Sequence, residues 1–130
     1  MFIIDPMSRQ PVYEQIIRQM ERFVLTGALK PGDQLPSVRS LSMNLSINPN
    51  TIQKAYSELD FRGIIYSVPG RGCFVSENAE NLLREYQRSR LRDIEGIARE
   101  MAMAGIPRQD VLDCVNAAYD QLDKGGSIHD

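Results

Sequence analysis

The chain of 130 residues has no tryptophan, two cysteines and one histidine, His129. A single histidine near the end of the sequence cannot build a His-based catalytic triad or a zinc cluster. Cys73 and Cys114 lie in segments of different predicted type and have no neighbouring base in the sequence, so we expect both thiols to be reduced. Glycine-rich phosphate loops that open a helix are also missing. We therefore expect no enzyme, no metal and no cofactor.

Long apolar segments are equally scarce. No run approaches the roughly 20 apolar residues that cross a bilayer. Residues 1–6 lack the charged region and apolar core of a signal peptide, and a basic nuclear import run is missing. The composition, with 42% hydrophobic and 25% charged residues, is ordinary for a globular protein. These features predict a bacterial cytoplasmic protein with no membrane partner.

The sequence also lacks an excess of positive charge, since its formal net charge is −2 and its pI about 5.4. Many DNA-binding domains are clearly basic. Residues 1–76, however, carry eight Lys/Arg and six Asp/Glu, a balance of +2, whereas residues 77–130 carry seven and eleven, a balance of −4. Contact with phosphates depends on local cations more than on total charge. The acidic C-terminal part therefore does not exclude a DNA-binding N-terminal part.

Apolar side chains recur at helical spacing in three segments of the first 63 residues. Residues 11–26 form the first, with Pro11 suited to the first helical position and Gly27 to the stop. The second helix is predicted to begin at Ser37, whose hydroxyl can accept from free backbone amides. Asn48 is the expected cap of a third helix that ends at Gly63. The predicted inward-facing residues are Val12, Tyr13, Ile16, Ile17, Met20, Phe23 and Val24, then Val38, Leu41 and Leu45, and finally Ile52, Ala55, Tyr56 and Leu59.

A β-hairpin is predicted after the third helix. Residues 64–68 and 73–76 have the composition of short strands around Pro69-Gly70-Arg71-Gly72, in which two glycines flank an arginine. Glycines allow a tight turn and a close approach of the backbone to a partner. Two helices joined by a short turn and followed by a hairpin form a winged helix-turn-helix, which holds one helix in the DNA major groove.

Polar side chains on the outward face of the third helix suit base reading. Asparagine or glutamine pairs with adenine, and lysine donates to guanine or to a phosphate. Arg39 is placed to reach a phosphate or a base edge, and Arg71 at the wing tip suits the electronegative minor groove. The expected DNA contacts are Ser37, Arg39, Asn48, Asn50, Thr51, Gln53, Lys54, Arg71 and Gly72.

Taken singly, these residues would form an ordinary solvated surface, with Ser37 and Asn48 serving only as helix caps. Their ordered combination is what indicates DNA. A winged helix that binds RNA or protein is the alternative, but the deep major groove of A-form RNA excludes a helix. A titration of duplex DNA against structured RNA separates the two.

The composition after Glu77 predicts a long helical run, which Gly105-Ile106-Pro107 interrupts before a last helix. The apolar stripes of these helices are too large to leave in water and too small to form a core alone. A second copy of the chain could cover them, and packing against the N-terminal domain is the alternative. The residues expected to mediate dimerisation are Leu82, Tyr86, Ile94, Ile97, Met101, Val111, Val115, Tyr119 and Leu122. A different hypothesis is that an effector pocket is lined by Tyr86, Met101, Met103 and Tyr119. Met and Tyr at helical spacing are, however, more often core residues.

Several motifs in register make residues 8–76 similar to the winged helix-turn-helix domain of GntR-family transcriptional regulators. They are Pro11-Val12-Tyr13-Glu14-Gln15-Ile16, then Leu29-Lys30-Pro31-Gly32-Asp33-Gln34-Leu35-Pro36-Ser37-Val38-Arg39, then Asn48-Pro49-Asn50-Thr51-Ile52, and Gly70-Arg71-Gly72. The resemblance implies a DNA-binding regulator, expected to be a repressor, that works as a dimer on an inverted-repeat operator. It places the helix-two arginine of the family at Arg39, the reading positions at Asn50, Thr51, Gln53 and Lys54, and the wing contact at Arg71 with Gly72. The short helical C-terminal part resembles the YtrA-type subfamily, in which it serves dimerisation.

The predicted fold class is mainly α with a small β-hairpin wing. We expect a winged helix-turn-helix DNA-binding domain at residues 1–77 and a helical hairpin for dimerisation at residues 78–130. The expected partners are double-stranded DNA, a second copy of the chain and an unidentified small-molecule effector that binds the C-terminal helices.

Overall fold

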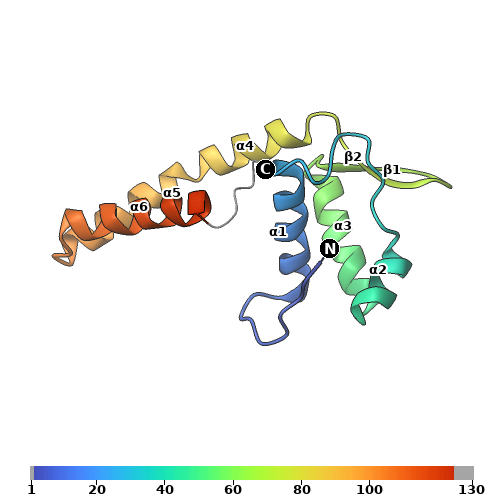
Figure 1. Cartoon of the computed structure of the whole chain (residues 1–130), viewed down its shortest axis with the longest axis horizontal. Helices are drawn as coiled ribbons and strands as arrows, with labels where there is room; N and C mark the ends of the chain where they lie inside the picture. Colours follow the sequence, from blue (N-terminus) through green and yellow to red (C-terminus); the bar gives the residue numbers. More distant parts are fainter. Residues whose placement is uncertain (1, 125–130) are drawn as a thin grey trace. The chain divides into compact units, whose positions relative to one another are not determined.

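The computed structural model describes residues 2–124, with side chains through residue 122. In this range the chain forms α1 (Val12–Leu25), α2 (Val38–Leu45), α3 (Pro49–Phe61), β1 (Ile65–Val68), β2 (Gly72–Val75), α4 (Ala79–Ser89), α5 (Leu91–Met103) and α6 (Arg108–Lys124) (Figure 1). The predicted mainly α fold with a β-hairpin wing is confirmed. His129 and the Gly125-Gly126-Ser127 segment lie outside the described residues. The chain divides into two compact units, Met1–Arg84 and Glu85–Asp130.

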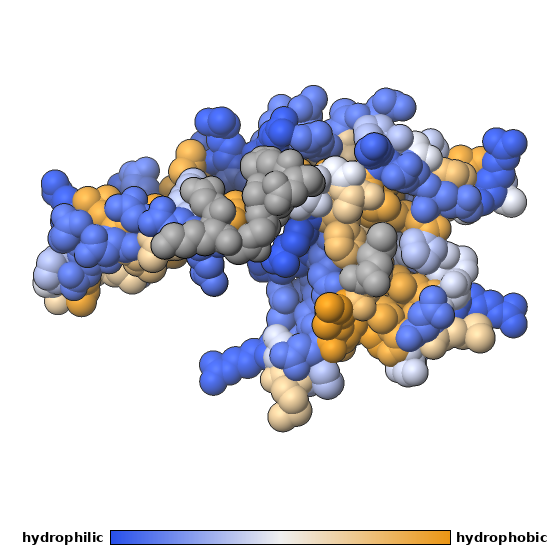
Figure 2. All heavy atoms as spheres, viewed as in Figure 1, coloured by the Kyte–Doolittle hydropathy of each residue, from blue (hydrophilic) through white to orange (hydrophobic). Residues whose placement is uncertain are grey.

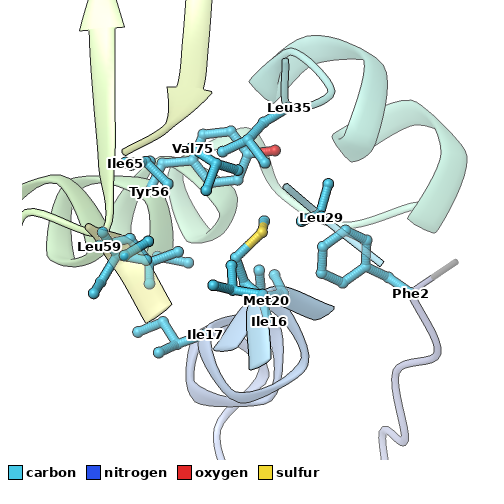
Figure 3. Packing of buried hydrophobic residues seen from close by; sticks show 14 of the residues in the cluster. Phe2, Ile16, Ile17, Met20, Leu29, Leu35, Tyr56, Leu59, Ile65 and Val75 are labelled. Carbon is cyan, nitrogen blue, oxygen red and sulfur yellow. The ribbon is translucent and has the colours of Figure 1, made fainter. Parts of the chain in front are cut away.

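The hydrophobic core of the first unit lies among α1, α3 and the hairpin (Figure 3). Ile16 and Met20 of α1 and Ile52 and Leu59 of α3 are completely buried. Their spacing of four residues in α1 and seven in α3 brings each pair to one side of its helix, as predicted. Complete burial of a side chain of this size contributes about 1.5–3 kcal/mol. The orientation of α3 against α1 is therefore strongly held.

The segment before α1 is fixed by Gln15, a polar residue that is only 6% exposed. Gln15 Oε1 accepts a hydrogen bond from the Asp5 amide (2.9 Å), and Gln15 Nε2 donates to the carbonyls of Asp5 (3.0 Å) and Gln10 (2.9 Å). Phe2 then packs edge-on against Phe23, with 5.4 Å between ring centroids. The N-terminal segment is thus part of the folded unit, which the sequence pattern did not indicate.

The two strands pair antiparallel, with Ile65 opposite Val75 and Val68 opposite Gly72. The hairpin also pairs with residues 33–35, which precede α2. Leu35 N donates to Cys73 O (2.9 Å), and Val75 N donates to Asp33 O (2.9 Å). The wing is therefore tied to a distant part of the sequence, not only to the end of α3.

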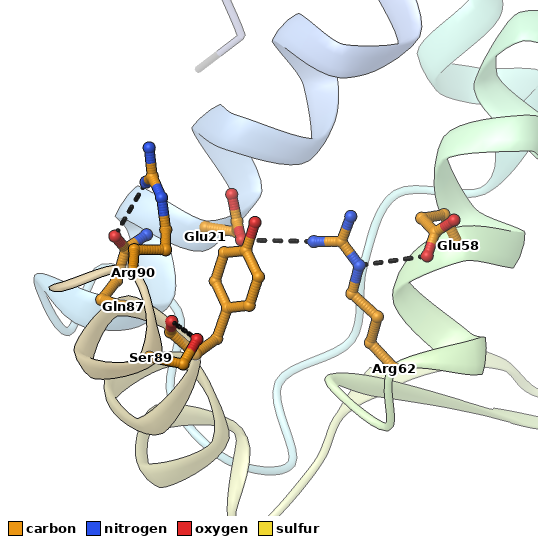
Figure 4. Close-up of polar contacts among 7 residues, drawn as sticks. Glu21, Glu58, Arg62, Gln87, Ser89 and Arg90 are labelled. Atoms are coloured by element: carbon orange, nitrogen blue, oxygen red, sulfur yellow. Dashed lines mark hydrogen bonds and ion pairs between the residues drawn. The ribbon is translucent and has the colours of Figure 1, made fainter. Parts of the chain in front are cut away.

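The single helical run expected between Glu77 and Gly105 is wrong, because the structure contains two helices that meet at Arg90. Ser89 Oγ donates to the Tyr86 carbonyl (2.6 Å; Figure 4). Arg90 N donates to Gln87 O (3.0 Å), three residues back. Both bonds tighten the last turn of α4, and a serine that bonds back to its own helix often bends it. The apolar period alone does not reveal such an interruption.

The helix α4 begins in the first unit, where Ala79 and Leu83 are buried, and ends in the second. Leu82 is half-buried against the same core. The division between the two compact units follows Arg84, and the functional domain boundary expected after residue 77 stays a prediction. In the second unit no described side chain of α5 or α6 is buried. No helix within residues 2–124 has the length and apolar character that a membrane crossing requires.

Candidate nucleic-acid interface

The helix α2 begins directly after its cap, Ser37. Ser37 Oγ accepts a hydrogen bond from Ser40 N (3.0 Å), which satisfies one of the amides that the first helical turn leaves free. Arg39 lies in this first turn and is exposed, whereas Leu41 is buried in the core. The cap and the buried leucine together fix the position from which the Arg39 side chain leaves the helix.

The turn between α2 and α3 depends on residues that the sequence analysis did not single out. Ser46 has a φ of 55°, in the left-handed region that few residues other than glycine adopt. Ile47 N donates to the Ser42 carbonyl (3.1 Å), and Ser42 Oγ donates back to the Ile47 carbonyl. These contacts end α2 and direct the chain into α3. Glycine is the usual residue at such a position, and because Ser46 stands there instead, the sequence did not indicate a left-handed turn.

The helix α3 starts at Pro49, after the cap Asn48. Asn48 Oδ1 accepts a hydrogen bond from Asn50 N (2.8 Å). The buried face of the helix consists of Ile52, Ala55, Tyr56 and Leu59, as predicted. The side chains of Asn50, Gln53, Lys54 and Ser57 are exposed, and Thr51 is half-buried. Gln53 Nε2 donates to Ser57 Oγ (3.1 Å), so this amide is oriented along the outer face of the helix.

Lys54 has a neighbour that its helical position did not predict. Its Nζ atom lies over the ring of Tyr13 in α1, 3.9 Å from the ring centroid. A cation–π contact at an exposed site contributes about 0.5–1 kcal/mol. The contact restrains the Lys54 ammonium near α1 but is weak enough to exchange for a phosphate.

Polar contacts of Tyr56 and Arg62 fix α3 within the first unit. Tyr56 is 2% exposed, and its hydroxyl donates to the Pro36 carbonyl (2.7 Å). Burial raises the pKa of this hydroxyl, with a smaller contribution from Cys73, so Tyr56 stays protonated as a donor. At the other end of α3, Arg62 lies between Glu58 (Nε–Oε2, 3.0 Å) and Glu21 of α1 (Nη1–Oε2, 3.5 Å) (Figure 4).

The wing tip is a tight turn that exposes Arg71. Arg71 N donates to Val68 O (2.9 Å), and the glycines on either side have positive φ angles, 77° at Gly70 and 120° at Gly72. The Arg71 carbonyl accepts a hydrogen bond from Gln34 Nε2 (2.8 Å). Both glycines are therefore required by the backbone, and Gln34 is a contributor that the sequence analysis missed.

The candidate interface consists of exposed cations and amides. Arg39, the α3 residues and Arg71 all belong to the first unit. Among the described residues, no group of three or more His, Cys, Asp or Glu side chains could hold a metal ion. Cys73 Sγ lies 3.4 Å from Ser67 Oγ, a hydroxyl that cannot act as a strong base. The chemistry available is hydrogen bonding and charge attraction, which suits nucleic-acid recognition.

The second unit carries an apolar groove of about 320 Å³ between α5 and α6. Ile94 and Ile97 remain 54% exposed there and Met101 40% exposed, and Figure 2 shows apolar residues at the surface of these helices among hydrophilic ones. The groove is lined by Ile94, Ile97, Ala98, Met101, Ile106, Asp110, Val111, Cys114 and Val115. Tyr86, Tyr119 and Leu122, the remaining residues expected at a dimer interface apart from the half-buried Leu82, are exposed.

The chain is similar to known regulators in both sequence and structure. Residues 12–75 match the family described as bacterial regulatory proteins, gntR family. The HTH-type transcriptional repressor YtrA of Bacillus subtilis is 40% identical over 100% of both chains. A solved GntR family transcriptional regulator from Listeria monocytogenes has a TM-score of 0.68 and 34% identity, covering 88% of this chain and 98% of that one. The structure of AraR(DBD) in complex with operator ORX1 has a TM-score of 0.51 and 29% identity, covering 57% of this chain and 92% of that one.

Proposed function

This chain belongs to the GntR family of bacterial regulatory proteins, and we propose that it is a transcriptional repressor that binds an inverted-repeat DNA operator as a homodimer. The observation that carries the proposal is the capped α2–α3 pair and its neighbouring wing, which expose Arg39, Gln53 and Arg71 from one rigidly packed unit. The structure of AraR(DBD) in complex with an operator supports DNA as the ligand. The similarity to the transcriptional repressor YtrA supports repression as the outcome.

In this proposal α3 is the reading helix and lies in the major groove. Asn50, Thr51 and Gln53 contact base edges, because they occupy the first two turns of α3, where Asn50 and Gln53 are exposed and Thr51 is half-buried beside them. Arg39 contacts a phosphate or a base edge beside α3. Lys54 leaves the Tyr13 ring for a phosphate, since a charged phosphate is the stronger partner. Ser37 and Asn48 contribute through their caps and through contacts at the helix N-termini.

The wing carries Arg71 into the adjacent minor groove. The negative potential of a narrow minor groove favours an inserted arginine. Gly72, which follows Arg71, adopts the positive φ that the tight turn requires and so contributes to the placement of Arg71. This contact is expected to add affinity for any duplex with a narrow minor groove, with less dependence on individual bases than the α3 contacts.

A homodimer is supported by the second unit. Two helices without a buried side chain among the described residues cannot supply the burial that a stable unit needs. A second copy related by a two-fold axis would cover the apolar groove between α5 and α6 and present two reading helices to two half-sites. The proposed interface consists of Tyr86, Ile94, Ile97, Met101, Val111, Val115, Tyr119 and Leu122, whereas Leu82 packs in the first unit.

The same groove is the observation that favours a second function, control of DNA affinity by a small effector. Its volume of about 320 Å³ lies at the lower end of the range for small-molecule sites. An effector held there would compete with the second copy for the same side chains, so it would act by changing the dimer equilibrium. We place either form of the regulator in the bacterial cytoplasm, where its DNA is.

The test is selection of bound duplexes from a random DNA library with the full chain, read by sequencing. An enriched inverted repeat supports both base reading and the dimer, and its spacing gives the separation of the two reading helices. Enrichment of single half-sites contradicts the dimer. No enrichment at low salt with folded protein contradicts DNA reading, and a parallel titration with structured RNA then tests the RNA-binding alternative.

A further inference from the structure

We propose that Gln34 is a positioning residue, which holds the backbone of the wing tip so that Arg71 is preset for the minor groove. The inference rests on the proposed function of the wing as a DNA contact. Gln34 lies 37 positions before Arg71 in the sequence, yet its Nε2 atom donates to the Arg71 carbonyl at 2.8 Å. Gln34 also pairs with Phe74 of β2 through the backbone. Its main chain and its side chain therefore hold two different parts of the wing.

The fit between Gln34 and the tip depends on Gly72. A Cβ atom at Gly72 would lie 2.9 Å from Gln34 Nε2, closer than real Cβ contacts. The φ of 120° at Gly72 is also one that side chains rarely permit. Because Gly72 has no side chain, the Gln34 amide can occupy the space beside it. The two positions therefore act together to hold the Arg71 carbonyl.

The wing needs such support because a two-stranded hairpin is marginally stable by itself. Ordering a backbone residue costs conformational entropy. If Arg71 were ordered only on meeting DNA, that cost would reduce the affinity, whereas a tip ordered in advance avoids it. The hydrogen bond from Gln34 supplies this order from a loop that is itself paired with β2.

The first test needs no DNA, so it stands whether or not the proposed function holds. Gln34→Met keeps the length of the side chain and its neutrality but cannot donate to the Arg71 carbonyl. Gln109→Met is the matched control, because Gln109 Nε2 also donates a hydrogen bond, to Asp113 Oδ1 (2.7 Å), but belongs to α6 in the second unit. The 15N relaxation of the Arg71 and Gly72 amides should show increased motion only in Gln34→Met. Unchanged order at both amides would overturn the inference.

The second test measures binding of the full chain to the duplex recovered by selection. Gln34→Met should weaken binding by about two- to ten-fold, the equivalent of one neutral hydrogen bond, while circular dichroism shows that the variant remains folded. In an Arg71→Ala background the same change should weaken binding by less than about two-fold, because Gln34 acts through Arg71. Equal losses in both backgrounds would show a direct or a general structural role and would refute the proposal. If the wild type selects no duplex, the proposed function fails and the relaxation test still decides the role of Gln34.

Discussion

Replacing Met101 by glutamate should separate the two copies of the proposed dimer. Met101 lines the apolar groove in the second unit and is 40% exposed. Met103, on the same helix, does not line that groove and is 85% exposed, so Met103→Glu is a matched control. Both changes keep a long, helix-favouring side chain and add one negative charge. They differ in whether that charge lies on the proposed interface.

The size of the effect follows from the exposed fraction of Met101. Complete burial of a methionine side chain contributes about 1.5–3 kcal/mol. The exposed 40% leaves about 0.6–1.2 kcal/mol to be gained in a dimer, and two-fold symmetry doubles it to about 1.2–2.4 kcal/mol. Loss of this contribution corresponds to a dissociation constant about 7- to 50-fold weaker, and the desolvation of two carboxylates adds to it.

Sedimentation equilibrium of the full chain over a range of concentrations measures this constant directly. Circular dichroism of both variants establishes that α5 and α6 keep their helical content. The expected result is a shift to monomer for Met101→Glu and little change for Met103→Glu. Equal dissociation constants for the two folded variants would refute the groove as the dimer interface.

Three further substitutions test the first unit. Arg71→Ala should weaken binding to specific and random duplexes alike and lower the slope of log affinity against log salt by about 1, as a salt titration of affinity would show. Gln53→Ala should relax the preference at one base position by about 1–3 kcal/mol, and an equal loss on random duplex in a competition assay would contradict a reading role. Ile52→Ala removes a completely buried side chain from α3 and should lower the free energy of unfolding by about 2–5 kcal/mol in urea denaturation. A cost below 1 kcal/mol would mean that the core around α3 is loosely packed.

The elements of the first unit could be predicted because each is marked by a local physical preference. Ser37 and Asn48 cap the helices that they were expected to cap, and the glycines around Arg71 adopt the positive φ angles that the turn requires. The buried faces of α1 and α3 follow the helical period. Such signals need no knowledge of the rest of the fold, because capping, turn geometry and amphipathic spacing act over a few residues.

The contacts that the sequence did not reveal join positions far apart in the chain. Gln15 and Gln34 are polar residues, and the sequence pattern around them suggests only that they lie on the solvated surface. In the folded chain each donates hydrogen bonds that hold a distant backbone segment in place. The Lys54–Tyr13 contact likewise depends on the packing of α3 against α1. The interruption at Arg90 was missed for a different reason, since the apolar period continues on both sides of it.

Three consecutive residues connect α3 to the wing. Gln34 holds the wing tip through the Arg71 carbonyl, and Leu35 is 4% exposed in the core and bonded to β2. The carbonyl of Pro36 accepts from Tyr56 of α3 (2.7 Å). These residues are adjacent in the chain, and together they contact both α3 and the wing. The length of this three-residue segment therefore limits how far α3 and the wing can move relative to each other. In the proposed binding mode, a DNA site that fits α3 in the major groove must therefore also present a minor groove at the distance set by this segment, which would restrict the operators that the first unit can bind.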